Sequence, residues 1–110
     1  MAIPHAGPGQ IIDVRLLGTS IGEQKTHTLA KAEGLEIIRL VLTAGKVIPA
    51  HATAGEITVQ CLEGHVVFTT MGKDLELTTG DLLFLTAHEP HAVRAVDDSS
   101  LLVTIVLPKK

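Results

Sequence analysis

The chain has 110 residues and a mass of 11.6 kDa, enough for one domain and too little for two. Nine Lys and Arg against twelve Asp and Glu give a net charge of -3, and the only basic run is Lys109-Lys110. This charge balance does not favour a nucleic-acid partner. Apolar runs such as residues 82–85 and 101–103 are far shorter than the roughly 20 residues of a membrane-spanning helix, so we expect no membrane partner either.

The amino-terminal residues and the cysteine content indicate a cytoplasmic protein. The first five residues contain neither a basic region nor an apolar stretch of the kind that marks a chain for export. The single cysteine, Cys61, excludes an internal disulfide and is typical of a reducing compartment.

The apolar residues are almost all aliphatic. Hydrophobic residues make up 45% of the chain, yet there is no Trp or Tyr and there are only two Phe. Branched aliphatic residues and Thr favour β-strands, whereas ligands that stack on aromatic side chains are disfavoured. The mean hydropathy of +0.36 is high for so small a chain and suggests that a second subunit covers part of its surface.

In chain order, we expect a flexible arm over residues 1–10 and a single domain over residues 11–110. Residues 23–33 are ambiguous, because Ala30, Lys31 and Ala32 tolerate a helix whereas Thr26 and Thr28 favour a strand. Short extended runs separated by turn residues predict about nine strands without a long helical period, which is typical of an all-β sandwich or barrel. The predicted strands are residues 11–17, 23–33, 35–42, 57–62, 66–70, 75–77, 82–86, 91–96 and 101–107.

Two stretches of the chain share the spacing of a known pair of motifs. In the first, five residues separate Gly45 from His51, and six separate Ile57 from Gly64. In the second, Gly80-Asp81 is followed by His91 at the expected distance. The two stretches resemble the paired motifs of the cupin superfamily and together cover residues 45–95, about half of the chain. The resemblance implies a double-stranded β-helix, or jelly-roll barrel.

The resemblance also implies a metal site, from which half of the ligands are missing. A typical cupin holds one divalent metal with three His and one Glu. Here His51 and His91 occupy two of these positions, while Thr53 and Ile57 occupy the other two. Glu56 is one residue out of register, and a bulge over residues 54–55 would turn it toward the site. His88 stands where the second motif has a glycine and is a further candidate ligand for Zn, Fe, Mn or Ni.

Strand alternation divides residues 57–62 between two faces. Ile57, Val59 and Cys61 share the face of the missing glutamate, so we expect them to line an apolar pocket beside Thr53 and the two histidines. Cys61 is either a reactive thiol near an imidazole or an inert core residue. The opposite face meets a partner subunit in related cupins, which predicts a homodimer interface formed by Thr58, Gln60 and Leu62.

Three functions remain open. The first is binding of a small molecule, a divalent metal or both at the barrel mouth. The second is a metal-dependent enzyme of the dioxygenase, isomerase or decarboxylase type, and the missing carboxylate counts against its non-haem-iron version. The third is a metal-free accessory scaffold. Fold-level analogy cannot decide among the three, because one barrel fold supports many unrelated chemistries. We rank binding first and the enzyme second.

Overall fold

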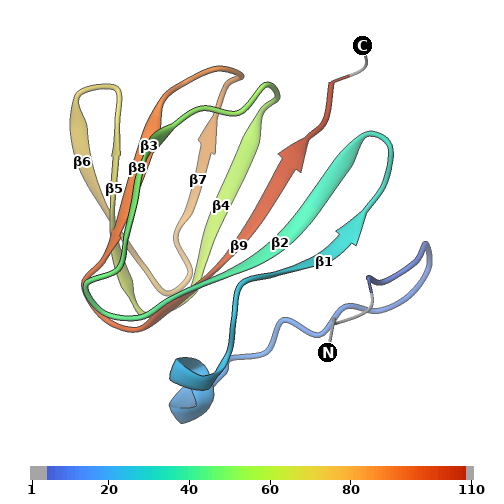
Figure 1. Ribbon diagram of the computed structural model, residues 1–110, viewed down its shortest axis with the longest axis horizontal. Coiled ribbons are helices and arrows are strands. Elements are labelled where there is room, and N and C mark those ends of the chain that lie inside the picture. Colours follow the sequence, from blue (N-terminus) through green and yellow to red (C-terminus); the bar gives the residue numbers. More distant parts are fainter. Residues whose placement is uncertain (1–4, 109–110) are drawn as a thin grey trace.

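The structure is a computed structural model that describes residues 5–108. It contains nine β-strands in two antiparallel sheets and one short 3-10 helix, η1 (Gly18–Glu23). Figure 1 shows the two sheets facing each other and joined along one side, as in a jelly-roll barrel. The strands are β1 (His27–Lys31), β2 (Leu35–Leu42), β3 (Val47–His51), β4 (Ile57–Glu63), β5 (His65–Thr70), β6 (Lys73–Thr78), β7 (Leu82–Leu85), β8 (His91–Ala95) and β9 (Ser99–Val106).

The larger sheet has the strand order β1-β2-β9-β4-β7 and the smaller has the order β3-β8-β5-β6. β4 and β5 therefore belong to different sheets, and the turn between them carries the chain across the barrel. Gly64 lies in this turn with φ +97, and a Cβ atom there would collide with Ser99 and with the carbonyl oxygen of Asp98. The turn requires a glycine both for its backbone conformation and for this close approach.

The hydrophobic core lies between the two sheets. On β4, buried residues alternate with half-buried ones, so that Ile57, Val59 and Cys61 face inward. They pair with inward-facing residues of β9, because Ile57 lies opposite Ile105 and Cys61 lies opposite Leu101. The all-β jelly-roll prediction is confirmed, and no helix within residues 5–108 is long and apolar enough to cross a membrane.

One of the predicted strands was wrong, and one strand of the structure was not predicted. Residues 11–17 form no strand, because polar groups of this segment bond to side chains rather than to a ladder: Leu17 N–H donates to Glu63, and the Arg15 carbonyl accepts from Arg39. β3 was missed, although it contributes His51. It contains Pro49, which is tolerated because β3 is an edge strand, and its register shifts between Ile48 and His51.

The ambiguous region 23–33 divides between the end of η1 and the strand β1. Of the predicted arm, residues 1–4 lie outside the described residues. Residues 5–10 contain no strand or helix, and Ala6 N–H donates to the Leu29 carbonyl of β1 at 2.7 Å. The extent of the arm and the domain boundary at residue 11 stay predictions.

Candidate functional site: an apolar cavity with two histidines

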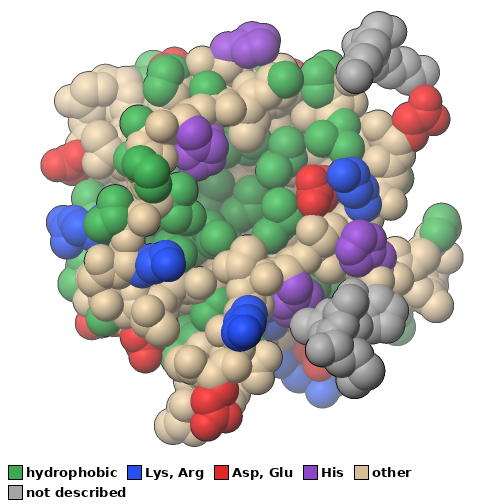
Figure 2. All heavy atoms as spheres, viewed as in Figure 1, with side chains coloured by type: hydrophobic (Ala, Val, Ile, Leu, Met, Phe, Trp, Pro, Cys, Tyr) green, Lys and Arg blue, Asp and Glu red, His purple; other side chains and the backbone are tan. Residues whose placement is uncertain are grey.

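A cavity of about 160 Å³ lies between the two sheets. Figure 2 shows the hollow from outside, with hydrophobic side chains forming its walls. Ten of its thirteen lining residues are aliphatic or aromatic, and three are polar. The lining residues are Ile38, Leu40, Ile48, His51, Thr53, Ile57, Val59, Phe68, His91, Val93, Leu101, Val103 and Ile105.

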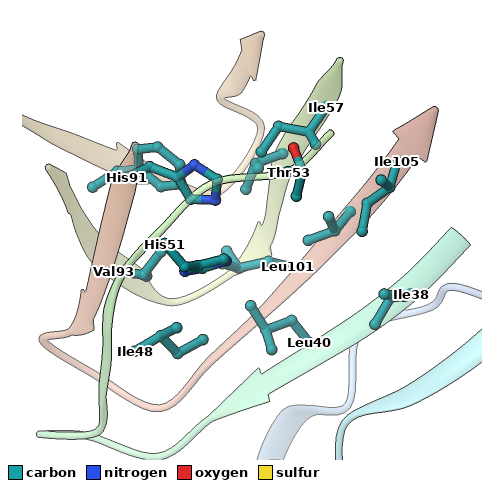
Figure 3. Close-up of a pocket in the computed structure, with 13 residues that line it drawn as sticks. Ile38, Leu40, Ile48, His51, Thr53, Ile57, His91, Val93, Leu101 and Ile105 are labelled. Carbon is teal, nitrogen blue, oxygen red and sulfur yellow. The ribbon is translucent and has the colours of Figure 1, made fainter. Parts of the chain in front are cut away.

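Two paired strand ends bring the histidines together. His51 is the last residue of β3 and His91 is the first residue of β8, and the two are directly opposite in the ladder. Their ring centroids lie 4.4 Å apart at an interplanar angle of 61°. On its other side, His91 stacks on Phe68 with centroids 5.4 Å apart. Figure 3 shows both rings directed into the space between the sheets.

The hydrogen bonds of the two rings indicate which nitrogen carries the proton. His51 Nδ1 lies 3.1 Å from the Pro49 carbonyl oxygen, and His91 Nδ1 lies 3.0 Å from the Glu89 carbonyl oxygen. Because a carbonyl only accepts, each Nδ1 must donate, and each Nε2 keeps a free lone pair. Among residues 5–108, neither Nε2 atom has a hydrogen-bond partner.

His91 is only 5% exposed, whereas His51 is exposed at the cavity mouth. Burial lowers the pKa of His91; the hydrogen bond to Glu89 partly opposes this, and the nearby His51 lowers the pKa further. The ring of His91 is therefore neutral at pH 7.

Thr53 lies in the loop between β3 and β4 and is the third polar lining residue. Its hydroxyl donates to the Gly55 carbonyl at 2.9 Å, so toward the cavity it offers an acceptor. The Thr53 carbonyl in turn accepts from His88 N–H at 2.8 Å, which ties the loop to the turn before β8. His88 itself is exposed and adopts φ +67, the conformation expected of the glycine it replaces.

The family of the chain follows from comparison with known proteins. A family model described as "Cupin domain" matches residues 38–107, which is more than half of the chain. The chain belongs to the cupin family. Among curated proteins, no match was found.

Solved structures share the fold of this cupin. An RmlC-like cupin protein from Desulfovibrio desulfuricans is 28% identical, with 88% of this chain and 97% of that chain covered and a TM-score of 0.73. A conserved protein of unknown function from Streptococcus pyogenes is 22% identical, with 100% and 97% covered and a TM-score of 0.76. A salicylate 1,2-dioxygenase from Pseudoaminobacter salicylatoxidans is 17% identical, with 73% and 25% covered and a TM-score of 0.69.

The donor set of this cupin does not fit a resident divalent metal. Zinc and non-haem iron need three or four protein ligands, and within residues 5–108 no group of three His, Cys, Asp or Glu side chains could hold a metal. Ile57 stands buried at the carboxylate position, and Glu56 is exposed and does not line the cavity. His88 does not line it either, so neither residue joins the histidine pair.

Cys61 faces the core but does not line the cavity, contrary to its predicted place there. Its side chain is fully buried, and its Sγ atom lies 3.5 Å from the Glu63 carbonyl and 3.8 Å from the Gly64 carbonyl. Burial raises the pKa of the Cys61 thiol, and the negative charge of Asp81 raises it further. A protonated, buried thiol is a poor nucleophile, so these contacts favour the inert alternative.

Sequence reasoning found five of the lining residues and missed eight. The missed residues include two of β2 and three of β9, the strands that form the back of the cavity. Alternation within residues 35–42 and 101–107 is a usable signal, since every second residue of each run faces inward. The missed residues are Ile38, Leu40, Ile48, Phe68, Val93, Leu101, Val103 and Ile105.

The outer face of the larger sheet carries the predicted interface residues. Thr58, Gln60 and Leu62 are half-buried. Across the ladder, Thr58 lies opposite Phe84 and Gln60 lies opposite Leu82, and these two β7 side chains are 61% and 64% exposed.

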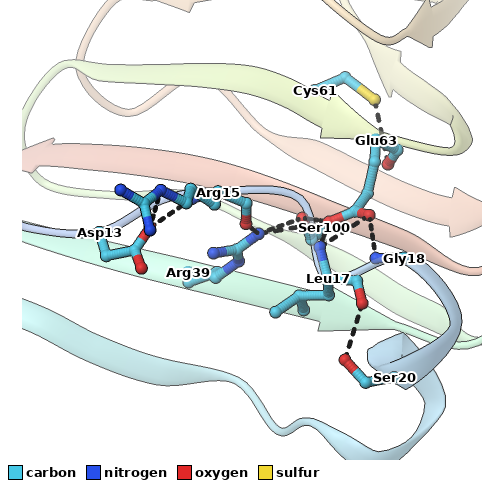
Figure 4. A network of polar contacts seen from close by, with 9 residues as sticks. All are labelled: Asp13, Arg15, Leu17, Gly18, Ser20, Arg39, Cys61, Glu63 and Ser100. Atoms are coloured by element: carbon cyan, nitrogen blue, oxygen red, sulfur yellow. Dashed lines mark hydrogen bonds and ion pairs between the residues drawn. The ribbon is translucent and has the colours of Figure 1, made fainter.

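A second polar group, the Glu63 cluster, consists of Glu63, Arg39, Ser100 and the backbone of residues 15–18. The Glu63 carboxylate accepts from Arg39 at 3.2 Å, from Ser100 at 2.8 Å, and from the N–H groups of Leu17 and Gly18 at 2.9–3.0 Å (Figure 4). Burial alone would raise the pKa of Glu63, but these hydrogen bonds and the guanidinium outweigh it, so the pKa lies below its ordinary value.

Proposed function

We propose that this cupin binds a small, largely apolar molecule in the cavity, with the polar end of that molecule between His51 and His91. The observation that carries the proposal is the cavity lining, in which ten apolar residues surround a single polar corner. Small-molecule sites in proteins have this composition. The size is also suitable, because an apolar cavity of about 150 Å³ is enough to bind benzene.

The proposal can be tested by NMR titration of protein with labelled Ile, Leu and Val methyl groups, using cyclohexane and cyclohexanol as probes. We expect saturable shifts confined to methyl groups that line the cavity, such as those of Ile38 and Val103. Val103→Phe places a larger side chain in the cavity and should weaken binding at least about tenfold, since it occupies the volume that the ligand needs. Absence of saturable shifts for both probes would contradict the proposal.

Val67→Phe is the matched control. Val67 is half-buried like Val103, but it lies on β5 outside the cavity lining, opposite Glu76 and Arg94. The same substitution there should leave the affinity for both probes unchanged. A similar loss of binding in both variants would mean that the effect comes from general destabilisation.

The metal-dependent enzyme is the alternative, and it needs a bound metal. Elemental analysis of tag-free protein, beside a variant carrying His51→Ala and His91→Ala, tests it directly. Because two imidazoles are too few for tight binding, we expect less than about a tenth of an equivalent of Zn, Fe, Mn or Ni per chain. Near one equivalent, lost in the variant, would favour the enzyme instead. If neither metal nor small molecule binds, the accessory scaffold remains.

We also infer that the protein is a homodimer through the outer face of β7, β4 and β9. Two cross-strand rows on this face contain no charged side chain, so a second copy can lie against it without like-charge repulsion. Their exposed Leu82 and Phe84 would lose apolar surface to water on association. The rows are Leu82–Gln60–Leu102 and Phe84–Thr58–Thr104.

Light scattering coupled to size-exclusion chromatography tests the dimer. We expect twice the chain mass for the native protein and the single-chain mass for the variant Leu82→Glu/Phe84→Glu. Met71→Glu is the control, because Met71 is 69% exposed but lies in the β5–β6 turn, away from these rows. A monomeric native protein would contradict the inference.

A further inference from the structure

The polar side chains of the cavity share one property that limits which molecules fit. Three polar side chains line it, and each presents an acceptor to the interior. His51 and His91 use their Nδ1–H groups on the carbonyl oxygens of Pro49 and Glu89, which leaves only the Nε2 lone pairs. Thr53 uses its hydroxyl proton on the Gly55 carbonyl and likewise keeps only lone pairs.

We propose that the cavity selects molecules whose polar group donates a hydrogen bond, such as alcohols and phenols, over molecules of the same shape whose polar group only accepts, such as ketones. The inference rests on the proposed small-molecule binding and specifies its ligand class. An alcohol placed at the histidine corner donates to one Nε2 atom. A ketone placed there brings a lone pair toward other lone pairs and leaves its buried carbonyl unpaired.

The backbone around the two rings maintains this arrangement. Moving the proton from Nδ1 to Nε2 would turn a ring into a donor, but the unprotonated Nδ1 would then face a carbonyl oxygen at 3.1 Å in His51 or at 3.0 Å in His91. Both contacts join a histidine to the residue two positions earlier in its own chain segment, so they depend on local backbone geometry and not on distant packing. The stacking of His91 on Phe68 restrains that ring further.

The arrangement also predicts how strong the selectivity is. A ketone can bind after one ring exchanges its proton between nitrogens, at the expense of one hydrogen bond. The preference is therefore finite, and the loss of a single well-placed hydrogen bond corresponds to about tenfold in affinity.

The test compares cyclohexanol with cyclohexanone, which have nearly the same shape and differ in whether the oxygen donates. Cyclohexane measures the apolar contribution alone. In methyl-NMR titrations we expect the dissociation constant of cyclohexanone to exceed that of cyclohexanol by about tenfold. In the variant His51→Phe/His91→Phe this preference should disappear, while cyclohexane still binds. His27→Phe is the control, since His27 also bonds through Nδ1 to a carbonyl, that of Lys25, but lies outside the cavity.

A second measurement needs no substitution. Long-range ¹H–¹⁵N spectra of the histidine rings report which nitrogen is protonated, and we expect Nδ1 for both His51 and His91. Equal affinities for alcohol and ketone, tighter binding of the ketone, or protonation at Nε2 in both rings would each overturn the selectivity while leaving small-molecule binding intact. If none of the three probes binds, the proposed function itself fails, and the two failures are thereby distinguished.

Discussion

The Glu63 cluster and the histidine pair differ in how their polar groups are hydrogen-bonded. In the Glu63 cluster, the carboxylate accepts from four groups at once, two of them backbone N–H groups of residues 17 and 18. In the histidine pair, each ring uses one nitrogen on its own chain segment and leaves the other free toward an apolar cavity. The Glu63 carboxylate is therefore saturated by its own protein, whereas each histidine of the pair keeps one unused acceptor nitrogen.

The difference separates a structural role from a role in recognition. A buried carboxylate whose lone pairs are filled by its own protein has nothing left to offer a ligand, and it fixes the residues that surround it. Here it attaches the irregular segment before η1 to the outer face of the larger sheet. A nitrogen whose lone pair faces an apolar space gains a hydrogen bond only when a ligand or water supplies a donor, which is why the proposed function assigns recognition to the histidine pair.

The largest expected effect comes from leaving the charge of Arg39 unpaired. Glu63→Leu removes the partner of a guanidinium whose side chain is only 5% exposed, and Arg39 Nε is already buried without a hydrogen-bond partner in the described part of the chain. We expect unfolding free energy to fall by about 3–5 kcal/mol, as measured by urea denaturation followed by circular dichroism. Arg39→Met in the same chain should restore part of it. A double variant that is as unstable as the sum of the two single variants would contradict this account.

A smaller loss of unfolding free energy is expected when the Glu63–Arg39 ion pair is kept and one hydrogen bond to it is removed. Ser100→Ala deletes the hydroxyl that donates to Glu63 at 2.8 Å, and a hydrogen bond to a charged group contributes about 1.5–3 kcal/mol. Thr53→Ala at the cavity is the comparison, because its hydroxyl bonds only to the nearby Gly55 carbonyl and is not part of a charged cluster. Equal losses of unfolding free energy for the two variants in the same urea titration would mean that the Glu63 cluster stabilises the fold no more than the Thr53 hydroxyl at the cavity does.

The sequence was informative about the fold because the fold depends on local rules. Turn residues and period-2 alternation predicted most of the strands. The resemblance to the paired cupin motifs implied that His51 and His91 lie in one barrel. The strand predicted over residues 11–17 does not form. Its apolar alternation would be the same whether its backbone bonded to a neighbouring strand or to side chains. Pro49 concealed β3 because the sequence does not show which strand is at an edge.

The site was predictable only in part, because its properties depend on contacts between distant residues. The sequence placed His51, Thr53, Ile57 and Val59 on the cavity side, but it could not show that Cys61 is buried without lining the cavity. It also could not show that both Nδ1 atoms are occupied by backbone carbonyls, since this depends on ring orientation. Similarly, Glu63 of β4 and Arg39 of β2 are 24 residues apart in the chain, so their ion pair could not be predicted from local sequence.

The smallest effect is a pH dependence that separates the two groups. The folded-state pKa of His91 lies below its ordinary value of 6.5, so near and below pH 6.5 the unfolded chain binds more protons and unfolding free energy falls as the solution is acidified. For Glu63, whose folded-state pKa lies below 4.5, the corresponding loss begins only below about that pH. His91→Phe should therefore flatten the stability profile between pH 7 and pH 5 and leave the loss below pH 4.5 unchanged. An unaltered slope between pH 7 and pH 5 would show that burial of His91 does not depress its affinity for protons.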